Sequence, residues 1–175
     1  PSRLFTSDLA KKINTRIVNP TLSAIKDMGT KYKGFLYVGL MIKDNNPYLV
    51  EFNVRMGDPE CQTILPLLED DLTEIMINSC SGDLKKNEIK LSKKKSICIV
   101  LCSKGYPEKY KNNTQIKNLG SLKLKKNEYL FHAGTKLENN EILSSGGRVL
   151  NFVSISENFK TSRAVSYTHL TLPTT

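Results

Sequence analysis

The sequence has no apolar run near the roughly 20 residues that a membrane-spanning helix requires. Its first ten residues, PSRLFTSDLA, contain neither the basic opening nor the apolar stretch of a signal peptide. From these two absences we expect a protein of the cytoplasm with no membrane span. The chain does not begin with Met, and we therefore expect its natural start to lie upstream.

Zinc ligands are also scarce. The four cysteines form no CxxC pair, and only two histidines could complete a cluster. Structural zinc usually needs four Cys or His ligands at short spacings, so we do not expect such a site. Cys98 and Cys102 lie in the apolar run SICIVLC, which predicts reduced, buried thiols.

The composition is that of an ordinary globular protein, with 39% hydrophobic and 25% charged residues in a chain of 175. Positive charge is concentrated in residues 82–136, which hold 14 Lys against 4 acidic residues, in a chain whose net charge is +9. Such a stretch could bind nucleic acid. It contains no Arg and no pattern of stacking aromatics, however, so we favour a solvated, Lys-rich surface.

Apolar periodicity predicts a helix near the beginning of the chain, with Ser7 as its N-cap and Gly29 as its stop. Pro20 lies inside the pattern, so we expect a kink or a break there. The buried face of this helix is defined by Leu9, Ile13, Ile17, Leu22 and Ile25. Two β-rich runs, 34–42 and 48–56, flank an Asn/Asp/Pro turn and predict an antiparallel hairpin.

A further helix is predicted to begin at Pro59 and to end near Gly82. Beyond it, short strands are predicted at 96–102, 128–132 and 148–156, separated by turns that contain glycine. We therefore expect an α+β fold in two domains. Residues 1–81 would hold the antiparallel hairpin and the helices, and residues 82–163 would form a small β-rich domain.

The final segment, 164–175, reads AVSYTHLTLPTT and matches the translation of a transposase adapter used in some sequencing libraries. We therefore predict that it is a non-native tail and that it packs on no core. The alternative is a frayed, β-rich end of the second domain.

Three polar residues, Glu51, Asn53 and Arg55, alternate with apolar ones, so on a strand they would share one face. Carboxylate and amide oxygens suit Mg²⁺, which keeps positions open for nucleotide phosphates. An Arg can grip a phosphate or a carboxylate through two parallel hydrogen bonds. The same pattern also suits the solvated face of an amphipathic strand, and it is the GDPE continuation at 57–60 that favours a site.

The run EFNVRMGDPECQ at 51–62 resembles the signature of the phosphoribosylamine–glycine ligase family, within the ATP-grasp superfamily. Four other segments resemble that family in the same order, namely GFLYVGLM, SKGYPEKY, FHAGTK and GGRVL. The resemblance covers residues 1–163. It implies that residues 1–81 are the distal half of an ATP-grasp core and that residues 82–163 are a β-rich C-terminal domain.

The resemblance implies ATP-dependent ligation of glycine to 5-phosphoribosylamine through a glycyl phosphate. Glu51 and Asn53 match the family's ligands for Mg²⁺ (or Mn²⁺), and Arg55 is expected to contact the transferring phosphoryl group or the glycyl carboxylate. Asp58 and Glu60 match the signature acids, which we assign to substrate binding or to ordering the loop. A monomer without nucleic-acid or membrane partners is expected.

Two departures from the family pattern affect these expectations. Residues 30–43 contain no acid, although many ATP-grasp enzymes carry another metal-binding carboxylate on that strand. The segments that would form the glycine-rich phosphate loop and the nucleotide clasp do not occur in this sequence, so we expect the polypeptide to be inactive alone. The alternatives are another ATP-grasp carboxylate–amine ligase, and a basic nucleic-acid-binding domain built on residues 82–136.

Overall fold

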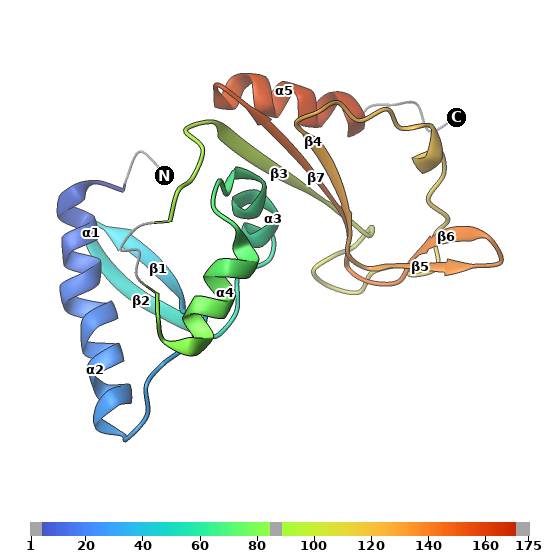
Figure 1. Cartoon of the computed structure of the whole chain (residues 1–175). Coiled ribbons are helices and arrows are strands. Elements are labelled where there is room, and N and C mark those ends of the chain that lie inside the picture. The colour runs from blue at the N-terminus through green and yellow to red at the C-terminus, as the bar shows by residue number, and fades with distance from the viewer. Residues whose placement is uncertain (1–4, 85–88, 171–175) are drawn as a thin grey trace. The chain divides into compact units, whose positions relative to one another are not determined.

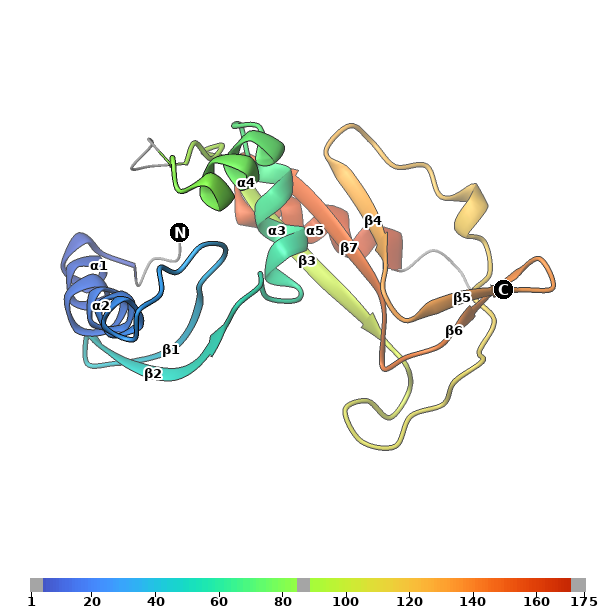
Figure 2. The same ribbon diagram turned by 60° about the horizontal axis from the view of Figure 1, so that its bottom comes forward.

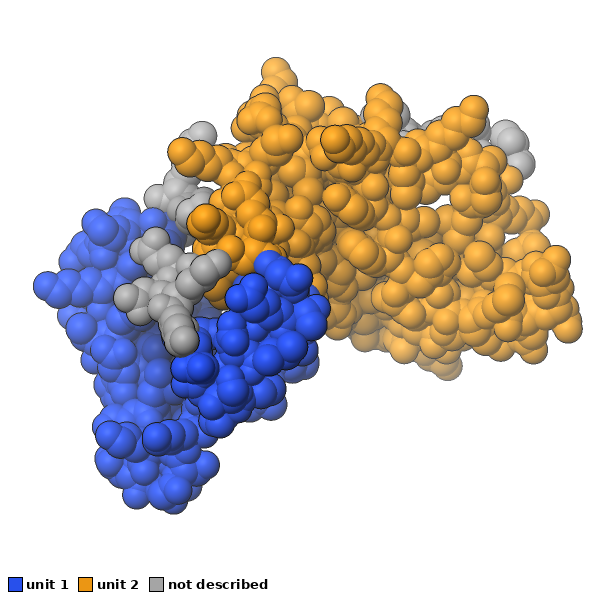
Figure 3. Space-filling view, viewed as in Figure 1, with its two compact units in different colours: residues 1–57, 71–87 blue, residues 58–70, 88–175 orange. Residues whose placement is uncertain are grey.

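The computed structural model describes residues 5–84 and 89–170, and the chain divides into two compact units (Figure 3). Unit 1 comprises residues 1–57 and 71–87, and unit 2 comprises residues 58–70 and 88–175. Each contains helices and antiparallel strands, which confirms the predicted α+β fold. The units assign residues 58–70 to the C-terminal part, whereas the predicted domain boundary follows residue 81; the domain assignment itself stays a prediction.

Unit 1 opens with three consecutive helical elements: α1 (Ser7–Ile13), the π-helical turn η1 (Asn14–Val18) and α2 (Asn19–Asp27). The N-cap is Thr6 rather than the predicted Ser7, because the Thr6 hydroxyl accepts the Leu9 N–H at 3.2 Å. Pro20 lies in the first turn of α2. Since proline has no N–H to donate, the helical hydrogen bonding widens into a π turn just before it instead of breaking.

The buried face of these helices is shorter than predicted. Leu9, Ile13 and Ile17 are buried, as expected, but Leu22 is 38% exposed. The helix ends where the sequence predicts, with Gly29 just beyond it at a φ of +87°.

Strands β1 (Tyr37–Lys43) and β2 (Asn46–Asn53) form the predicted antiparallel hairpin. The turn between them consists of Asp44 and Asn45, with φ values of 50° and 55°. Asp and Asn tolerate this left-handed conformation better than most residues do, and it matches the twist of the two strands. The strand β2 ends at Asn53, before the predicted end at residue 56.

The prediction of one continuous helix from Pro59 to Gly82 is wrong. The structure has α3 (Glu60–Ile64) and the 3₁₀ turn η2 (Leu65–Leu67) in unit 2, and α4 (Leu72–Ser81) in unit 1. Pro66 lacks the N–H that would continue α3. Asp71 then caps α4, because its carboxylate accepts two backbone N–H groups at 2.7 and 3.1 Å. Gly82, at a φ of 81°, ends α4 as predicted.

The centre of unit 2 is an antiparallel sheet of three strands in the order β3 (Lys95–Cys102), β7 (Arg148–Ser156), β4 (Glu128–His132) (Figures 1 and 2). All three were predicted. A second hairpin of β5 (Thr135–Glu138) and β6 (Glu141–Ser144) and a 3₁₀ turn, η3 (Leu119–Ser121), complete the unit with its helices. The apolar core lies on the middle strand, at Val149, Leu150, Phe152, Val153 and Ile155.

Helix α5 (Phe159–Leu170) contacts β3 and β7 and was not predicted. Its residues Ser162 and Ser166 are fully buried. The Ser154 hydroxyl on β7 donates to the Ser162 carbonyl oxygen at 2.6 Å and lies 2.8 Å from the Ser166 hydroxyl. The expectation that residues 164–175 pack on no core is therefore wrong for Ser166. The non-native origin of this segment stays a prediction.

Candidate functional site

Glu51 and Asn53 lie at the end of β2, two residues apart on one face of the hairpin. The Asn53 side-chain amide donates a hydrogen bond to Glu51 Oε1 at 2.9 Å. Glu51 is exposed and Asn53 is half-buried. The structure therefore brings together the two residues predicted as metal ligands and leaves the carboxylate open to solvent.

This pair fits a hard divalent cation that substrate oxygens complete. Mg²⁺ is commonly bound through one or two protein carboxylates together with phosphates and water. Within residues 5–84 and 89–170, no group of three or more His, Cys, Asp or Glu side chains gathers that could hold a metal alone. The carboxylate of Glu51 and the amide oxygen of Asn53 are thus suitable ligands, provided that the amide turns its oxygen toward the cation.

Arg55 does not extend the face of the strand, because β2 ends two residues earlier and the backbone bends at Val54 and Arg55. Its guanidinium Nη1 donates to the Met56 carbonyl oxygen at 3.0 Å, and its side chain is exposed. The prediction that Arg55 lies on the same strand face as Glu51 and Asn53 is therefore wrong, because the strand does not continue to Arg55. A role of Arg55 in catalysis stays a prediction.

Asp58 belongs to unit 2 and forms an ion pair there. Its Oδ2 lies 3.0 Å from Arg148 Nη2, and Arg148 Nη1 donates to the Asp58 carbonyl oxygen at 3.2 Å. The Gln62 amide donates to Asp58 Oδ1 at 2.9 Å. Glu60, half-buried, lies in the first turn of α3. Asp58 is thus held by two side chains of its own unit.

Three segments that carry the family resemblance meet around Arg148. The Ser103 backbone N–H and hydroxyl donate to the carbonyl oxygens of Gly147 and Gly146, each at 2.8 Å. The Gly134 N–H donates to the Arg148 carbonyl oxygen, also at 2.8 Å. A Cβ on Gly147 would overlap the Tyr106 ring, so a side chain there would have to displace that ring. Sequence reasoning gave Arg148 no role, although an Arg directly after two glycines in GGRVL was a usable signal.

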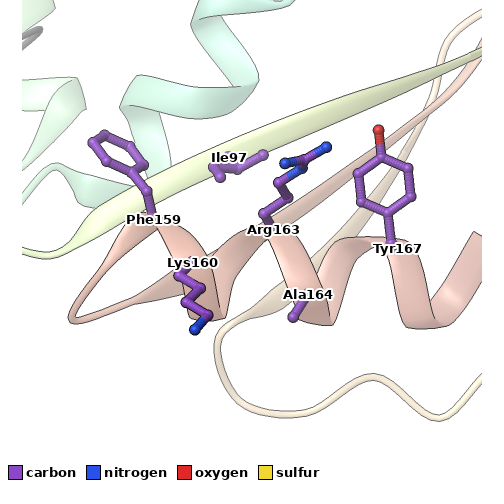
Figure 4. A pocket seen from close by; sticks show the side chains of 6 residues that line it. All are labelled: Ile97, Phe159, Lys160, Arg163, Ala164 and Tyr167. Atoms are coloured by element: carbon purple, nitrogen blue, oxygen red, sulfur yellow. The ribbon is translucent and has the colours of Figure 1, made fainter.

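A shallow pocket of about 670 Å³ lies between β3 and α5 in unit 2 (Figure 4). Its lining residues are Ile97, Phe159, Lys160, Arg163, Ala164 and Tyr167. The Arg163 guanidinium lies 5.5 Å from the centre of the Tyr167 ring, which is a cation–π contact. These side chains offer no carboxylate, so the pocket does not suit a hard cation.

Cys98 on β3 is not poised for chemistry. Burial, together with the negative charge of Asp58, raises the pKa of its thiol to about 11. The thiol therefore stays protonated near neutral pH, and a protonated thiol is neither a good nucleophile nor a metal ligand.

Two family models match this chain. The model for the ATP-grasp (A) domain of phosphoribosylglycinamide synthetase matches residues 1–61, and the model for its C domain matches residues 96–173. The hairpin with its Glu51–Asn53 pair thus lies in an ATP-grasp domain, which defines the class of protein. Within that class, the chain belongs to the phosphoribosylglycinamide synthetase family.

Individual relatives agree with this family. The chain is 40% identical over 156 residues to a phosphoribosylamine–glycine ligase of Caldanaerobacter subterraneus, covering 89% of this chain and 37% of that one. It is 38% identical over 159 residues to a human trifunctional purine biosynthetic protein, covering 90% of this chain and 16% of that one. The crystal structure of the Thermotoga maritima ligase superposes with a TM-score of 0.79 at 30% identity, covering 95% of this chain and 40% of that one. The chain thus spans about two fifths of the length of single-function relatives.

Proposed function

We propose that this chain is part of an ATP-dependent ligase that joins glycine to 5-phosphoribosylamine, and that it supplies the metal-binding strand and the C domain. The observation that carries the proposal is the Glu51–Asn53 pair, hydrogen-bonded at 2.9 Å at the end of a strand within the matched ATP-grasp domain. The substrates are taken from relatives that are named phosphoribosylamine–glycine ligases.

The proposed reaction has two steps. A glycine carboxylate oxygen attacks the γ-phosphorus of ATP, which forms a glycyl phosphate and releases ADP. The amine of phosphoribosylamine then attacks the glycyl carbon, the bond from that carbon to the phosphate oxygen breaks, and glycinamide ribonucleotide forms as phosphate and a proton leave. No protein nucleophile is needed, so the enzyme contributes alignment and charge stabilisation.

The roles of the residues follow from their surroundings. Glu51 and Asn53 would hold Mg²⁺ or Mn²⁺, which neutralises charge on the nucleotide phosphates. Arg55, exposed next to them in sequence, would contact the transferring phosphoryl group or the glycyl carboxylate. Asp58 is engaged by Arg148, which favours ordering of the loop over contact with the substrate amine. Glu60, half-buried in the first turn of α3, would order the loop or contact that amine.

Glu51→Gln in a full-length ligase that carries this segment tests the proposal. The variant keeps the size of the side chain but removes the charge of the carboxylate. We expect ADP release that depends on glycine and phosphoribosylamine to fall by about 10²-fold or more, as for loss of one charge-stabilising group, with unchanged thermal melting. The matched control is Glu157→Gln. Glu157 is an exposed acid, and its ion pair with Lys94 is long, at 3.7 Å, and lies on the surface.

If the Glu51→Gln variant and the natural enzyme were equally active at saturating Mg²⁺, Glu51 would not be a metal ligand. A loss of the same size in the Glu157→Gln control would show that the assay responds to any change of charge. Only a loss confined to Glu51→Gln supports the proposed site.

We propose small-molecule partners only, in a monomeric enzyme of the cytoplasm. The lysines described in the basic stretch 82–136 are exposed, apart from the half-buried Lys95, as expected for a solvated surface. No helix within the described ranges is long and apolar enough to cross a membrane. Affinity for DNA or RNA that falls steeply with salt concentration would contradict the assignment of small-molecule partners, because it would indicate multiple phosphate contacts.

A further inference from the structure

The residue opposite Glu51 in the hairpin is Gly39 on β1. A Cβ built on Gly39 would lie 2.9 Å from Glu51 Cγ, which is closer than real Cβ atoms approach other carbons. The next contacts of this Cβ, with the Glu51 backbone oxygen and nitrogen, would be 3.4 and 3.7 Å. The conflict therefore concerns the side chain of Glu51 and spares the backbone of the hairpin.

Gly39 does not need to be glycine for conformational reasons, because its φ lies outside the left-handed region. Glycine inside a strand normally weakens the strand relative to alanine. The register of the hairpin also shifts directly after Gly39, between Gly39 and Leu40. Glycine at position 39 therefore costs the strand some stability. Strand formation gives no reason for a glycine at this position.

The space above Gly39 is occupied by the Glu51 side chain in the conformation that meets Asn53. Glu51 is exposed, so its side chain can rotate about the Cα–Cβ bond when a methyl group enters this space. Such a rotation would carry the carboxylate away from Asn53 and break the 2.9 Å hydrogen bond. Alanine at position 39 would therefore change the geometry of the metal pair and leave the hairpin intact.

We infer that Gly39 is a positioning residue, which keeps Glu51 in the conformation that binds the cation together with Asn53. This inference rests on the proposed metal role of Glu51. Residues that orient a metal ligand typically change metal affinity by about 10–100-fold when they are mutated, and we expect an effect of that size for Gly39→Ala.

The test uses a full-length ligase that carries this segment, with Mn²⁺ as the probe in the presence of saturating ADP. Enzyme-bound Mn²⁺ is measured from the enhancement of water proton relaxation over that of Mn²⁺ and ADP without enzyme, and folding is measured by thermal melting. We expect Gly39→Ala to weaken Mn²⁺ binding about 10–100-fold at an unchanged or higher melting temperature. The control is Gly120→Ala, because a Cβ on Gly120 would meet nothing within 4 Å.

A double variant separates positioning from general damage. If Gly39 acts through Glu51, then Gly39→Ala adds no further loss of Mn²⁺ affinity in a Glu51→Gln background. Additive losses would overturn the inference, and so would normal Mn²⁺ binding by Gly39→Ala or failure of that variant to fold. Normal Mn²⁺ binding by Glu51→Gln would instead overturn the proposed metal site itself.

Discussion

Deleting residues 164–175 is expected to destabilise unit 2, because the deletion removes the second half of α5. This helix has 12 residues and contacts β3 and β7. Truncation after Arg163 leaves only five of them, and so short a helix is not stable by itself. The buried Ser166 and its contact with Ser154 are lost at the same time.

The size of the effect can be worked from these contacts. One buried hydrogen bond between hydroxyl groups contributes about 1 kcal/mol. Loosening the helix that covers the middle strand adds about the same again, so we expect the free energy of unfolding to fall by about 2 kcal/mol. For a chain of this length, that corresponds to a melting temperature roughly 4–8 °C lower. Ser166→Ala alone should cost about 1 kcal/mol.

Urea unfolding of the chain, followed by circular dichroism, measures this difference. Deletion of residues 171–175 is the control, since it leaves every described contact of α5 in place. Equal unfolding midpoints for chains ending at Arg163 and at Thr175 would refute the reasoning. They would show that α5 beyond Arg163 contributes nothing, as expected for a non-native tail that packs on no core.

Four further outcomes are expected. Arg148→Lys loses the two-point contact with Asp58. Because both side chains are about 40% exposed, urea unfolding should show a free energy of unfolding lower by less than about 1 kcal/mol. A decrease above about 2 kcal/mol would contradict this expectation. Cys98 should react with iodoacetamide at pH 8 more slowly than the exposed Cys102. Because the folded state raises the Cys98 pKa from 9.0 to about 11, this thiol should lower stability as pH rises through that window, and Cys98→Ala should make the fall shallower. Arg55→Lys in a full-length ligase should fold normally and lose about 10²–10³-fold in kcat, whereas a normal kcat would mean that Arg55 is only a surface charge.

The hairpin and the Glu51–Asn53 pair could be predicted because both depend on local chemistry. Alternation with period two places the two side chains on one face of any strand, whatever surrounds it. An Asp-Asn turn between β-rich runs then brings the two strands together. The strands of the second unit were predicted for the same reason, since each is a short apolar run between turns that contain glycine.

The helix break at Leu68 was missed because apolar residues continue across it with nearly helical spacing. Pro66 and Asp71 carried the correct signal, one by ending α3 and the other by capping α4. Helix α5 was missed because its packing depends on serines. Ser162 and Ser166 have low helix propensity, and only tertiary contacts with the middle strand reveal them as buried.

The positioning role inferred for Gly39 could not be predicted from the local sequence, because it depends on the register in which β1 pairs with β2. A glycine in GFLYVGLM has no visible link to a glutamate twelve residues later until the pairing of β1 with β2 sets them opposite each other. Had the strands been paired one residue differently, a residue with a side chain would oppose Glu51 and the carboxylate would adopt another conformation. The hairpin therefore contributes to the proposed metal site in two ways. The alternation of side chains along β2 places Glu51 and Asn53 on one face. The pairing register places Gly39 opposite Glu51, which leaves room for the Glu51 side chain to reach Asn53.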